Sequence, residues 1–430
     1  MKATAPLEAP VVPKNNLDQQ TGEQPIPSVL ISPAKLSTFV IYFGFAATGV
    51  GMALPGSVLP TLLAQWSLAD SEAGLLFFLA WLGSSLGALL VPAPFSRSLA
   101  LGALLAAIAT FGIAFGTFGA RWLCFTWMAL FGMGLGITMT STSLLRCSRS
   151  PQRRGMELNR LNLVWSLGAC LCPSLAAHSL RVTSVRAIFC AMGVIFSLLL
   201  LWTFAVECDG FRGGLWRLKA ESGQVSEVRL GHDSDRRKAG AFWFWPIALT
   251  VLVFLPTGIE SSMGGWIAAY ALRTQHTIAT TVTAGTCFWI GLLASRTLSS
   301  TLLYLRQAEM FVFRVSVGLV VAGTALLIGA HTSLPVLIGT LLVGFGLGPV
   351  YPLLLAVALR YSHNSRIFFV AGLGSACLPW LTGVVSSAAG SLRIGLLVPF
   401  AASLLMLSLG LRLRNQDWSS TDGNSQQLGF

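Results

Sequence analysis

The pentapeptide Gly132-Met-Gly-Leu-Gly136 recurs 212 residues further along the chain as Gly344-Phe-Gly-Leu-Gly348. Each copy lies within an uncharged, apolar stretch, at 122–145 and at 333–359. A helix needs about 20 consecutive apolar residues to cross the hydrocarbon core of a bilayer. The two stretches therefore predict a pair of similar membrane-spanning helices.

A second pair of sequences repeats at nearly the same spacing. Leu167-Gly-Ala-Cys-Leu-Cys-Pro173 is matched by Leu373-Gly-Ser-Ala-Cys-Leu-Pro379, an offset of 206 residues. Glycine-rich apolar helices can match by chance, so either pair alone is weak. Two independent matches at nearly one offset indicate a six-helix unit that occurs twice in parallel orientation.

The composition supports a membrane protein. Hydrophobic residues make up 54% of the 430 residues and charged residues only 10%, whereas a soluble protein carries about 25% charged residues. So few charges cannot cover a water-facing surface, and lipid must be the solvent for most of the chain. The net charge of +12 does not indicate nucleic acid, because nearly all Lys and Arg lie in short gaps between apolar runs, where they act as topology signals.

Twelve apolar runs are long enough to span a membrane. They fall at 38–63, 72–93, 98–118, 122–145, 159–180, 186–206, 242–271, 278–298, 309–330, 333–359, 366–388 and 392–412. We therefore predict an all-α membrane protein with an N-terminal six-helix bundle at 38–206 and a C-terminal six-helix bundle at 242–412. The rest is predicted to be a disordered tail at 1–37, a linker loop at 207–241 and a second tail at 413–430.

Lys and Arg are unevenly divided between the two sides of the predicted bundle. If both termini lie on one side, that side holds 21 of them and the opposite side holds five. Cytoplasmic loops carry an excess of Lys and Arg. This asymmetry predicts a multi-pass protein of the plasma (inner) membrane with both tails and the linker loop in the cytoplasm.

Glycine and proline gather in the first and fourth predicted helices of each half. Interrupted helices at corresponding positions of two repeats are typical of a central binding site, because freed backbone groups are tolerated only beside protein or a wet cavity. Small residues also let helices pack closely, so tight packing is the alternative. The residues expected to break helices and line a cavity are Pro55, Gly56, Gly136, Gly264, Gly348 and Pro349.

Glu260 is the one acidic residue, of sixteen, that lies near the middle of a predicted span. An ionisable group costs about 2.5–3.5 kcal/mol there on insertion scales, so we predict that Glu260 contacts a solute or a coupling ion. Trp266 and Tyr270 form an i,i+4 pair about two turns on. A carboxylate beside aromatic rings suits a polyhydroxy ligand or a cation. The alternative is a buried, protonated Glu260 bonded to a neighbouring helix.

Other polar and aromatic residues carry weaker signals. Asn162 is the deepest polar residue at the start of the fifth span and is predicted as a secondary contact, with a polar helix start as the alternative. Trp289 and Trp380 are more typical of packing or lipid-facing residues. No P-loop, soluble-enzyme motif or metal-ligand spacing of Cys and His is present, so we expect no enzyme, cofactor or metal.

Local sequences resemble the fucose permease-like (sugar–proton symporter) branch of the major facilitator superfamily. The marks of the resemblance are Leu54-Pro-Gly-Ser-Val-Leu-Pro60, Trp66-Ser-Leu-x-Asp70-x-x-Ala-Gly74, Arg160-Leu-Asn-Leu163, Gly168-Ala169 with Pro173, Gly258-Ile-Glu260 with Trp266 and Tyr270, Phe288-Trp-Ile-Gly291 with Arg296, and Leu378-Pro-Trp380. The resemblance implies two six-helix bundles that rock about a midplane site, with sugars as the default solute.

The chain departs from this family at two places. In the fucose permease, acidic residues in the first and fourth helices serve proton coupling, whereas the matching stretches here offer Gly56 and Met139. The loop after the second span keeps only Arg97 of its usual Asp-Arg pair, while the second half keeps Arg296, which is expected to help hold a cytoplasmic gate. Coupling through Glu260, coupling to another ion, and uniport all remain open.

These patterns favour a monomeric secondary or facilitative transporter that moves a sugar or other small polar solute by alternating access. The predicted partners are this solute, the lipid bilayer and a coupling proton or cation. Efflux of a drug or metabolite is the alternative within transport. A non-transporting membrane sensor or scaffold, acting through the tail and the linker loop, is the alternative outside it.

Overall fold

The structure, a computed structural model, describes residues 37–92, 94–116, 121–149, 154–212, 244–275, 277–306, 309–361 and 366–412. Within these ranges, twelve helices are long and apolar enough to cross a membrane, and no strand is found. The twelve spans that the sequence predicts are therefore confirmed. The tails and the linker loop predicted at 1–37, 207–241 and 413–430 lie outside the described residues, apart from Ser37 and 207–212.

Within the described residues, six membrane spans form each half of the molecule. The N-terminal half comprises α1 (Thr38–Trp66), α2 (Asp70–Leu89), α3 (Phe95–Phe115), α4 (Arg121–Arg149), α5 (Arg154–Val182) and α6 (Val185–Arg212). The C-terminal half comprises α7 (Phe244–Gln275), α8 (Ile278–Arg306), α9 (Glu309–Gly329), α10 (Ser333–Tyr361), α11 (Arg366–Ala389), α12 (Leu392–Gly395) and α13 (Leu397–Leu411). The twelfth span consists of α12 and α13, which join at Leu396.

Polar residues mark both ends of α1 and the start of α2. Ser37 caps α1, because its hydroxyl accepts a hydrogen bond from the backbone N–H of Val40 at 3.3 Å. Ser67 ends α1 in the left-handed conformation, with φ 49°. Glu72 then starts α2 by accepting the backbone N–H of Ala69 at 2.8 Å. These caps satisfy backbone groups that a helix leaves unpaired at its ends.

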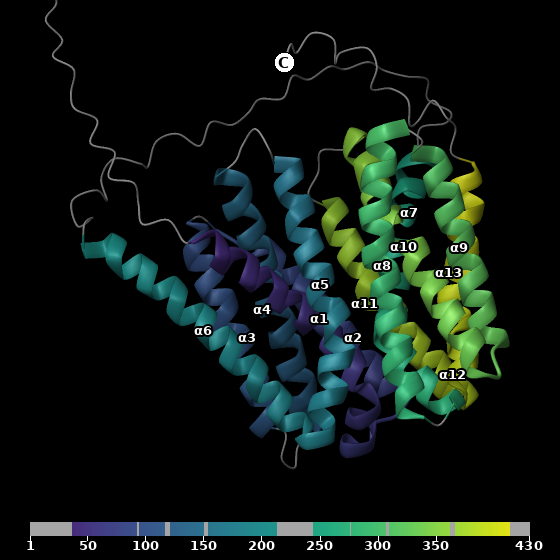
Figure 1. Ribbon diagram of the computed structural model, residues 1–430, viewed down its shortest axis with the longest axis horizontal. Coiled ribbons are helices and arrows are strands. Elements are labelled where there is room, and N and C mark those ends of the chain that lie inside the picture. The colour runs from purple at the N-terminus through teal and green to yellow at the C-terminus, as the bar shows by residue number, and fades with distance from the viewer. Residues whose placement is uncertain are drawn as a thin grey trace, which may run out of the picture.

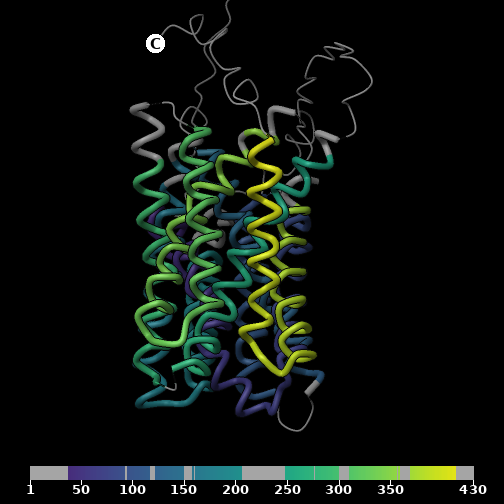
Figure 2. The backbone as a smooth tube through the Cα atoms, turned by 90° about the vertical axis from the view of Figure 1, so that its right-hand side faces the viewer, coloured from purple at the N-terminus to yellow at the C-terminus, as the bar shows by residue number. Residues whose placement is uncertain are grey.

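The two halves lie side by side in Figure 1, the N-terminal half in purple to teal and the C-terminal half in green to yellow. Figure 2 shows the helices of the C-terminal half running nearly parallel along the long direction of the bundle. We call the end at which α6 finishes and α7 begins the linker end, and the opposite end the far end. Helices α1 and α13 also have their outer termini at the linker end.

The repeated glycine ladder has the same packing role in both halves. In the N-terminal half, a Cβ at Gly132 or Gly136 of α4 would collide with backbone oxygens of α2. In the C-terminal half, a Cβ at Gly344 or Gly348 of α10 would collide with Phe288 and Ser295 of α8. Small residues permit this close approach of helices in a membrane. The sequence repeat therefore corresponds to a repeated pair of helix contacts, α2 with α4 and α8 with α10.

The expectation that glycine and proline break the helices is wrong. Helices α1, α4, α7 and α10 each continue as one helix through the residues in question. Pro55 and Pro349 are buried within α1 and α10. A membrane helix tolerates proline in its interior because neighbouring helices can pack around the freed backbone groups. Gly136 and Gly348 serve packing inside one half, which was the alternative interpretation.

Among the described residues, the main contacts between the two halves are α2 with α11, α1 with α7, and α5 with α8. At the α1–α7 contact, a Cβ on Gly56 would collide with the backbone oxygen of Gly264. At the α2–α11 contact, Gly74 approaches the backbone oxygen of Trp380 so closely that a Cβ would lie 2.8 Å from it. These three pairs form the seam along which a site shared by both halves can lie.

Candidate functional site

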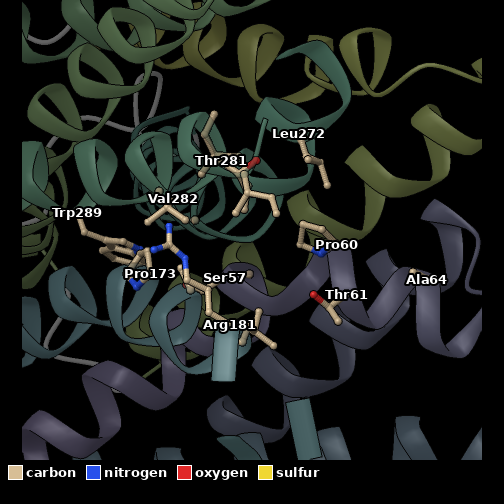
Figure 3. Close-up of a pocket in the computed structure, with 18 residues that line it drawn as sticks. Ser57, Pro60, Thr61, Ala64, Pro173, Arg181, Leu272, Thr281, Val282 and Trp289 are labelled. Atoms are coloured by element: carbon tan, nitrogen blue, oxygen red, sulfur yellow. The ribbon is translucent and has the colours of Figure 1, made fainter. Parts of the chain in front are cut away.

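Two adjoining hollows lie in the seam. The outer cavity, about 520 Å³, lies between α1 and α5 on one side and α7 and α8 on the other, in the far-end half of these helices (Figure 3). The inner chamber, about 20 Å³, lies deeper and is bounded by residues of α1, α2, α5, α7 and α8, including Glu260. Gly56, Gly264 and Trp289 line both hollows, so the chamber continues directly from the cavity.

An ion pair occupies one wall of the inner chamber. The Arg296 guanidinium on α8 lies 3.2 Å from the Glu260 carboxylate on α7, and each side chain is 15% exposed. Arg296 also donates a hydrogen bond to the Ser166 hydroxyl on α5 at 3.1 Å, and its guanidinium carbon lies 5.7 Å from the centre of the Trp165 ring. The C-terminal half thus supplies both charges, and the N-terminal half contacts them with a hydroxyl and an aromatic face.

Three buried nitrogens around the chamber have no acceptor among the described residues. They are Nε1 of Trp81, Nε1 of Trp165 and Nε of Arg296. Trp81 and Trp165 line the chamber, and Arg296 bonds to Glu260 in its wall. A buried donor without a partner costs about 1–3 kcal/mol. Three such donors around one hollow are typical of a site that binds an acceptor-rich ligand.

Aromatic rings lie where the two hollows adjoin. Trp289 packs edge-on against Trp165 across the seam, with ring centroids 5.8 Å apart. Gly264 leaves room for the indole, because a Cβ on Gly264 would lie 3.0 Å from Cζ2 of Trp289. The two hollows therefore adjoin beside the Trp289 indole and the glycines of the α1–α7 contact.

Trp266 and Tyr270, predicted as solute contacts, instead brace the C-terminal half. Trp266 is fully buried and its indole N–H donates to the backbone oxygen of Pro379 on α11 at 2.9 Å. Tyr270 is almost fully buried and its hydroxyl donates to the backbone oxygen of Leu327 on α9. Neither residue lines the cavity or the chamber, because each polar tip is already bonded to a carbonyl of its own bundle.

The other predicted residues divide between site and scaffold. Asn162 is exposed on α5 and lines neither hollow. Arg296, expected at a cytoplasmic gate, is part of the ion pair beside the chamber. Among the predicted glycines, Gly56 and Gly264 line both hollows. The structure therefore brings together Glu260, Arg296, Gly56 and Gly264.

The sequence did not identify Trp81 and Trp289 as residues of the site. Trp81 carries no polar neighbours that mark it, and Trp289, interpreted as a packing or lipid-facing residue, is only 6% exposed and lines both hollows. The available signal was weak: each lies inside an apolar run in which a tryptophan can face lipid, protein or a cavity. Only the neighbouring helices distinguish these cases.

Among the described residues, no three His, Cys, Asp or Glu side chains gather in a way that could hold a metal ion. Among the cysteines whose side chains the structure describes, Cys124, Cys170, Cys172, Cys190, Cys287 and Cys377 form no disulfide. The chemistry of the site therefore comes from a carboxylate, a guanidinium, indole N–H groups and aromatic faces, which together suit non-covalent binding of a small molecule.

Twelve membrane-spanning helices form two parallel halves, and a hollow suited to ligand binding lies in the seam between them. This arrangement defines the class of membrane transporters that are built from two helix bundles. A family model described as Major Facilitator Superfamily matches residues 41–378. The chain belongs to the Major Facilitator Superfamily and is a membrane transporter.

A solved structure shares this fold. The nucleoside transporter NupG superposes with a TM-score of 0.62 at 12% sequence identity, over 87% of this chain and 96% of that one. At this identity the likeness concerns the fold alone. No curated protein matches this chain in sequence.

Proposed function

We propose that the protein carries a sugar or a related small polar solute across the plasma (inner) membrane by alternating access, and that it binds the solute in the inner chamber. The main support is the set of unpaired donors around the chamber: Trp81, Trp165 and Arg296 each present a buried N–H without an acceptor among the described residues. Glu260 adds an acceptor to the same wall.

This pattern of donors and acceptors fits a polyhydroxy ring. A hydroxyl group accepts and donates hydrogen bonds, so neighbouring hydroxyls can bond to an indole N–H and to the Glu260 carboxylate at once. The C–H faces of a sugar ring also pack well on an indole such as Trp289. The fucose permease-like resemblance supports sugars, and the likeness to a nucleoside transporter adds nucleosides, whose ribose carries the same hydroxyls.

The small volume of the chamber supports a mechanism with moving bundles. A volume of about 20 Å³ holds roughly one water molecule, since a single water needs about 10–15 Å³ on this measure. A sugar therefore enters the chamber only when α1 and α5 move away from α7 and α8. The excess of Lys and Arg at the linker end supports a cytoplasmic linker loop and tails, so the outer cavity faces the opposite side.

The site is complete within one chain, which supports a monomer as the working unit. The proposal leaves the coupling role to Glu260, the one carboxylate of the chamber, as the group that would exchange a proton or cation. Efflux of lipophilic cations is less favoured, because the outer cavity carries the cation Arg181 in its lining.

Uptake into proteoliposomes tests the proposal. Purified protein is reconstituted and offered radiolabelled hexoses, sugar acids and nucleosides, with dye efflux as the competing assay. We expect a sugar-class substrate whose apparent affinity falls about three- to tenfold in Trp81→Phe and in Trp165→Phe, since each variant loses one hydrogen bond worth about 0.5–1.5 kcal/mol.

Trp127→Phe is the matched control. Its indole nitrogen is also buried without a partner among the described residues, but the indole packs against Gly112 of α3 and Gly116 directly after α3, away from the seam. Equal losses in all three variants would assign the effect to folding. Dye efflux without sugar or nucleoside uptake would overturn the proposal in favour of a drug transporter, and an absence of any flux would favour a sensor.

A further inference from the structure

Arg181 is the one charged residue among the described residues that line the outer cavity. It lies in the last turn of α5, at the far end, and Figure 3 shows it among the residues that line the cavity. The rest of the lining is apolar or carries hydroxyl groups. A single positive charge therefore dominates the electrostatic potential of a cavity of about 520 Å³.

Within the described ranges, the charge of Arg181 has no acidic partner. No carboxylate lies within ion-pair distance of it among the described residues, whereas Arg273 at the same end forms a two-pronged ion pair with Asp70 at 2.6 and 2.7 Å. Glu72, the other acidic residue at this end, accepts the N–H of Ala69. The residues at this end that the structure does not describe, 117–120 and 276, contain no Asp or Glu.

Hydroxyl groups face the same cavity. Ser57 and Thr61 on α1 and Thr281 on α8 all line it. The Thr61 hydroxyl makes no hydrogen bond among the described residues. Ser57 donates to the Ala53 oxygen and accepts the Cys172 thiol, while Thr281 donates to the oxygen of Thr277, so that each keeps a lone pair for a ligand. The lining thus combines one cation with several hydroxyl groups, on walls from both halves of the molecule.

We propose that the outer cavity is a binding site for a small hydroxylated monoanion, a sugar acid, whose carboxylate binds Arg181. This inference rests on the proposed sugar transport and narrows its substrate class. A guanidinium binds a carboxylate through two parallel hydrogen bonds, and this geometry discriminates a sugar acid from a neutral sugar. The hydroxyls of the same ligand bond to the Ser57, Thr61 and Thr281 side chains.

The cavity leads the anion to the inner chamber. The two hollows share Gly56, Gly264 and Trp289. Glu260 and Arg296 form an ion pair without net charge, so the chamber does not repel an arriving carboxylate. Arg181 serves as the first contact, and the donors of the chamber bind the hydroxyl groups when the bundles rearrange.

Competition between matched charged and neutral sugars tests the inference. Proteoliposomes are offered D-glucuronate, D-galacturonate and D-gluconate beside D-glucose, D-galactose and sorbitol. We expect the wild type to prefer one of the acids. Arg181→Gln should raise the apparent KM of that acid about tenfold or more and leave the neutral sugars unchanged, because a hydrogen-bonded ion pair is lost. Arg181→Lys should give an intermediate KM for the acid, since lysine keeps the positive charge but cannot form the two parallel hydrogen bonds of a guanidinium.

Arg393→Gln is the control at the same end. Arg393 is a far-end arginine whose side chain donates to the backbone oxygen of Ala330 at 2.7 Å within the C-terminal half, so its loss should not change the preference for acids. Arg181 is exposed, so its variants are expected to fold.

The outcomes separate this inference from the proposed function. One outcome is uptake of neutral sugars without a preference for acids, with equal rates in the wild type and Arg181→Gln. This result overturns the inference, while the proposed sugar transport stands. If no sugar is transported, calorimetry with the purified protein decides: Arg181-dependent binding of a sugar acid supports the site, and no binding overturns it. Stronger Arg181-dependent binding of octanoate than of any sugar acid would also overturn it, in favour of an apolar anion.

Discussion

In the N-terminal half, Met52 lies four residues before Gly56, and in the C-terminal half, Glu260 lies four residues before Gly264. The two glycines meet at the α1–α7 contact, and Met52 and Glu260 both line the inner chamber. One half therefore places a thioether where the other places a carboxylate. The repeated fold sets the shape of the seam, while single residue differences set its chemistry.

The two halves also differ in the hydrogen-bond donors that they place around the chamber. The N-terminal half supplies the neutral indole N–H groups of Trp81 and Trp165, and the C-terminal half supplies the charged Arg296. Because Glu260 and Arg296 belong to one half, a movement of the two halves does not pull opposite charges apart. Of the contacts that this ion pair makes, such a movement breaks only the hydrogen bond between Arg296 and Ser166 and the contact with the Trp165 ring. A site with both charges on one body can therefore open at low cost.

The largest expected effect comes from removing one charge of the C-terminal half. Arg296→Met leaves the Glu260 carboxylate buried without its partner, which should lower stability by about 3–5 kcal/mol and abolish uptake. The double variant Arg296→Met with Glu260→Gln should regain most of the stability but no uptake. Thermal unfolding in detergent and proteoliposome flux measure the two effects. If the Arg296→Met protein is as stable as the wild type, the Glu260 carboxylate does not need Arg296 to be tolerated in the folded protein.

The second largest effect is expected where the two halves approach each other closely. In Gly56→Ala, the added methyl group would collide with the backbone oxygen of Gly264, and such overpacking costs about 1–3 kcal/mol. We expect a lower melting temperature and slower uptake, because α1 and α7 can no longer meet. Gly318→Ala on α9 is the control, since its Cβ would meet nothing within 4 Å. Equal behaviour of both variants would mean that the α1–α7 contact plays no part in transport.

A smaller effect is expected at the far end, where an ion pair does cross between the halves. Asp70 on α2 binds Arg273 on α7 and the Ser386 hydroxyl on α11 at 2.5 Å. Arg273 is 44% exposed, so the pair is worth about 1 kcal/mol or less. Asp70→Asn should therefore increase the population that is open at the far end by a few fold.

Spin labels measure this change. Val182 on α5 and Ile278 on α8 are exposed, at 73% and 67%, and labels there in a cysteine-free background report the distance between the halves at the far end. The exchange variant Asp70→Arg with Arg273→Asp should restore the wild-type distance distribution. A distribution that is unchanged in Asp70→Asn would remove this ion pair from the conformational equilibrium.

The smallest effect is expected within the N-terminal half, at the linker end. Glu157 accepts hydrogen bonds from Arg146 at 2.6 Å and from the Tyr42 hydroxyl at 3.0 Å. The bond from Arg146 is the main cause that lowers the pKa of the Glu157 carboxyl below its usual value of 4.5. A lowered pKa stabilises the folded protein above the pKa of the unfolded chain, and this contribution is lost as the pH falls through the folded pKa.

Glu157→Gln should therefore lower the melting temperature at pH 7 by about 1–3 °C. The difference from the wild type should shrink as the pH is lowered below 4.5, and uptake should change little. A difference that grows with acidity would contradict the assigned cause of the pKa shift.

Sequence alone could predict the helices of this protein. Hydropathy and length located all twelve spans, including the short break between α9 and α10, because lipid requires every crossing segment to be long, apolar and internally hydrogen-bonded. The repeated glycine ladder predicted the duplication, and the one acid at mid-span predicted Glu260 as part of the site.

The partners of these residues are decided by tertiary structure. Trp266 and Tyr270 looked like ligand contacts but bond to carbonyls of α11 and α9, whereas Trp81 and Trp165 present unpaired donors to the chamber. The physical reason is that hydropathy and spacing describe one helix at a time. Which side of that helix meets lipid, a neighbour or a hollow depends on how helices distant in sequence tilt and approach, and here on glycines that let them touch.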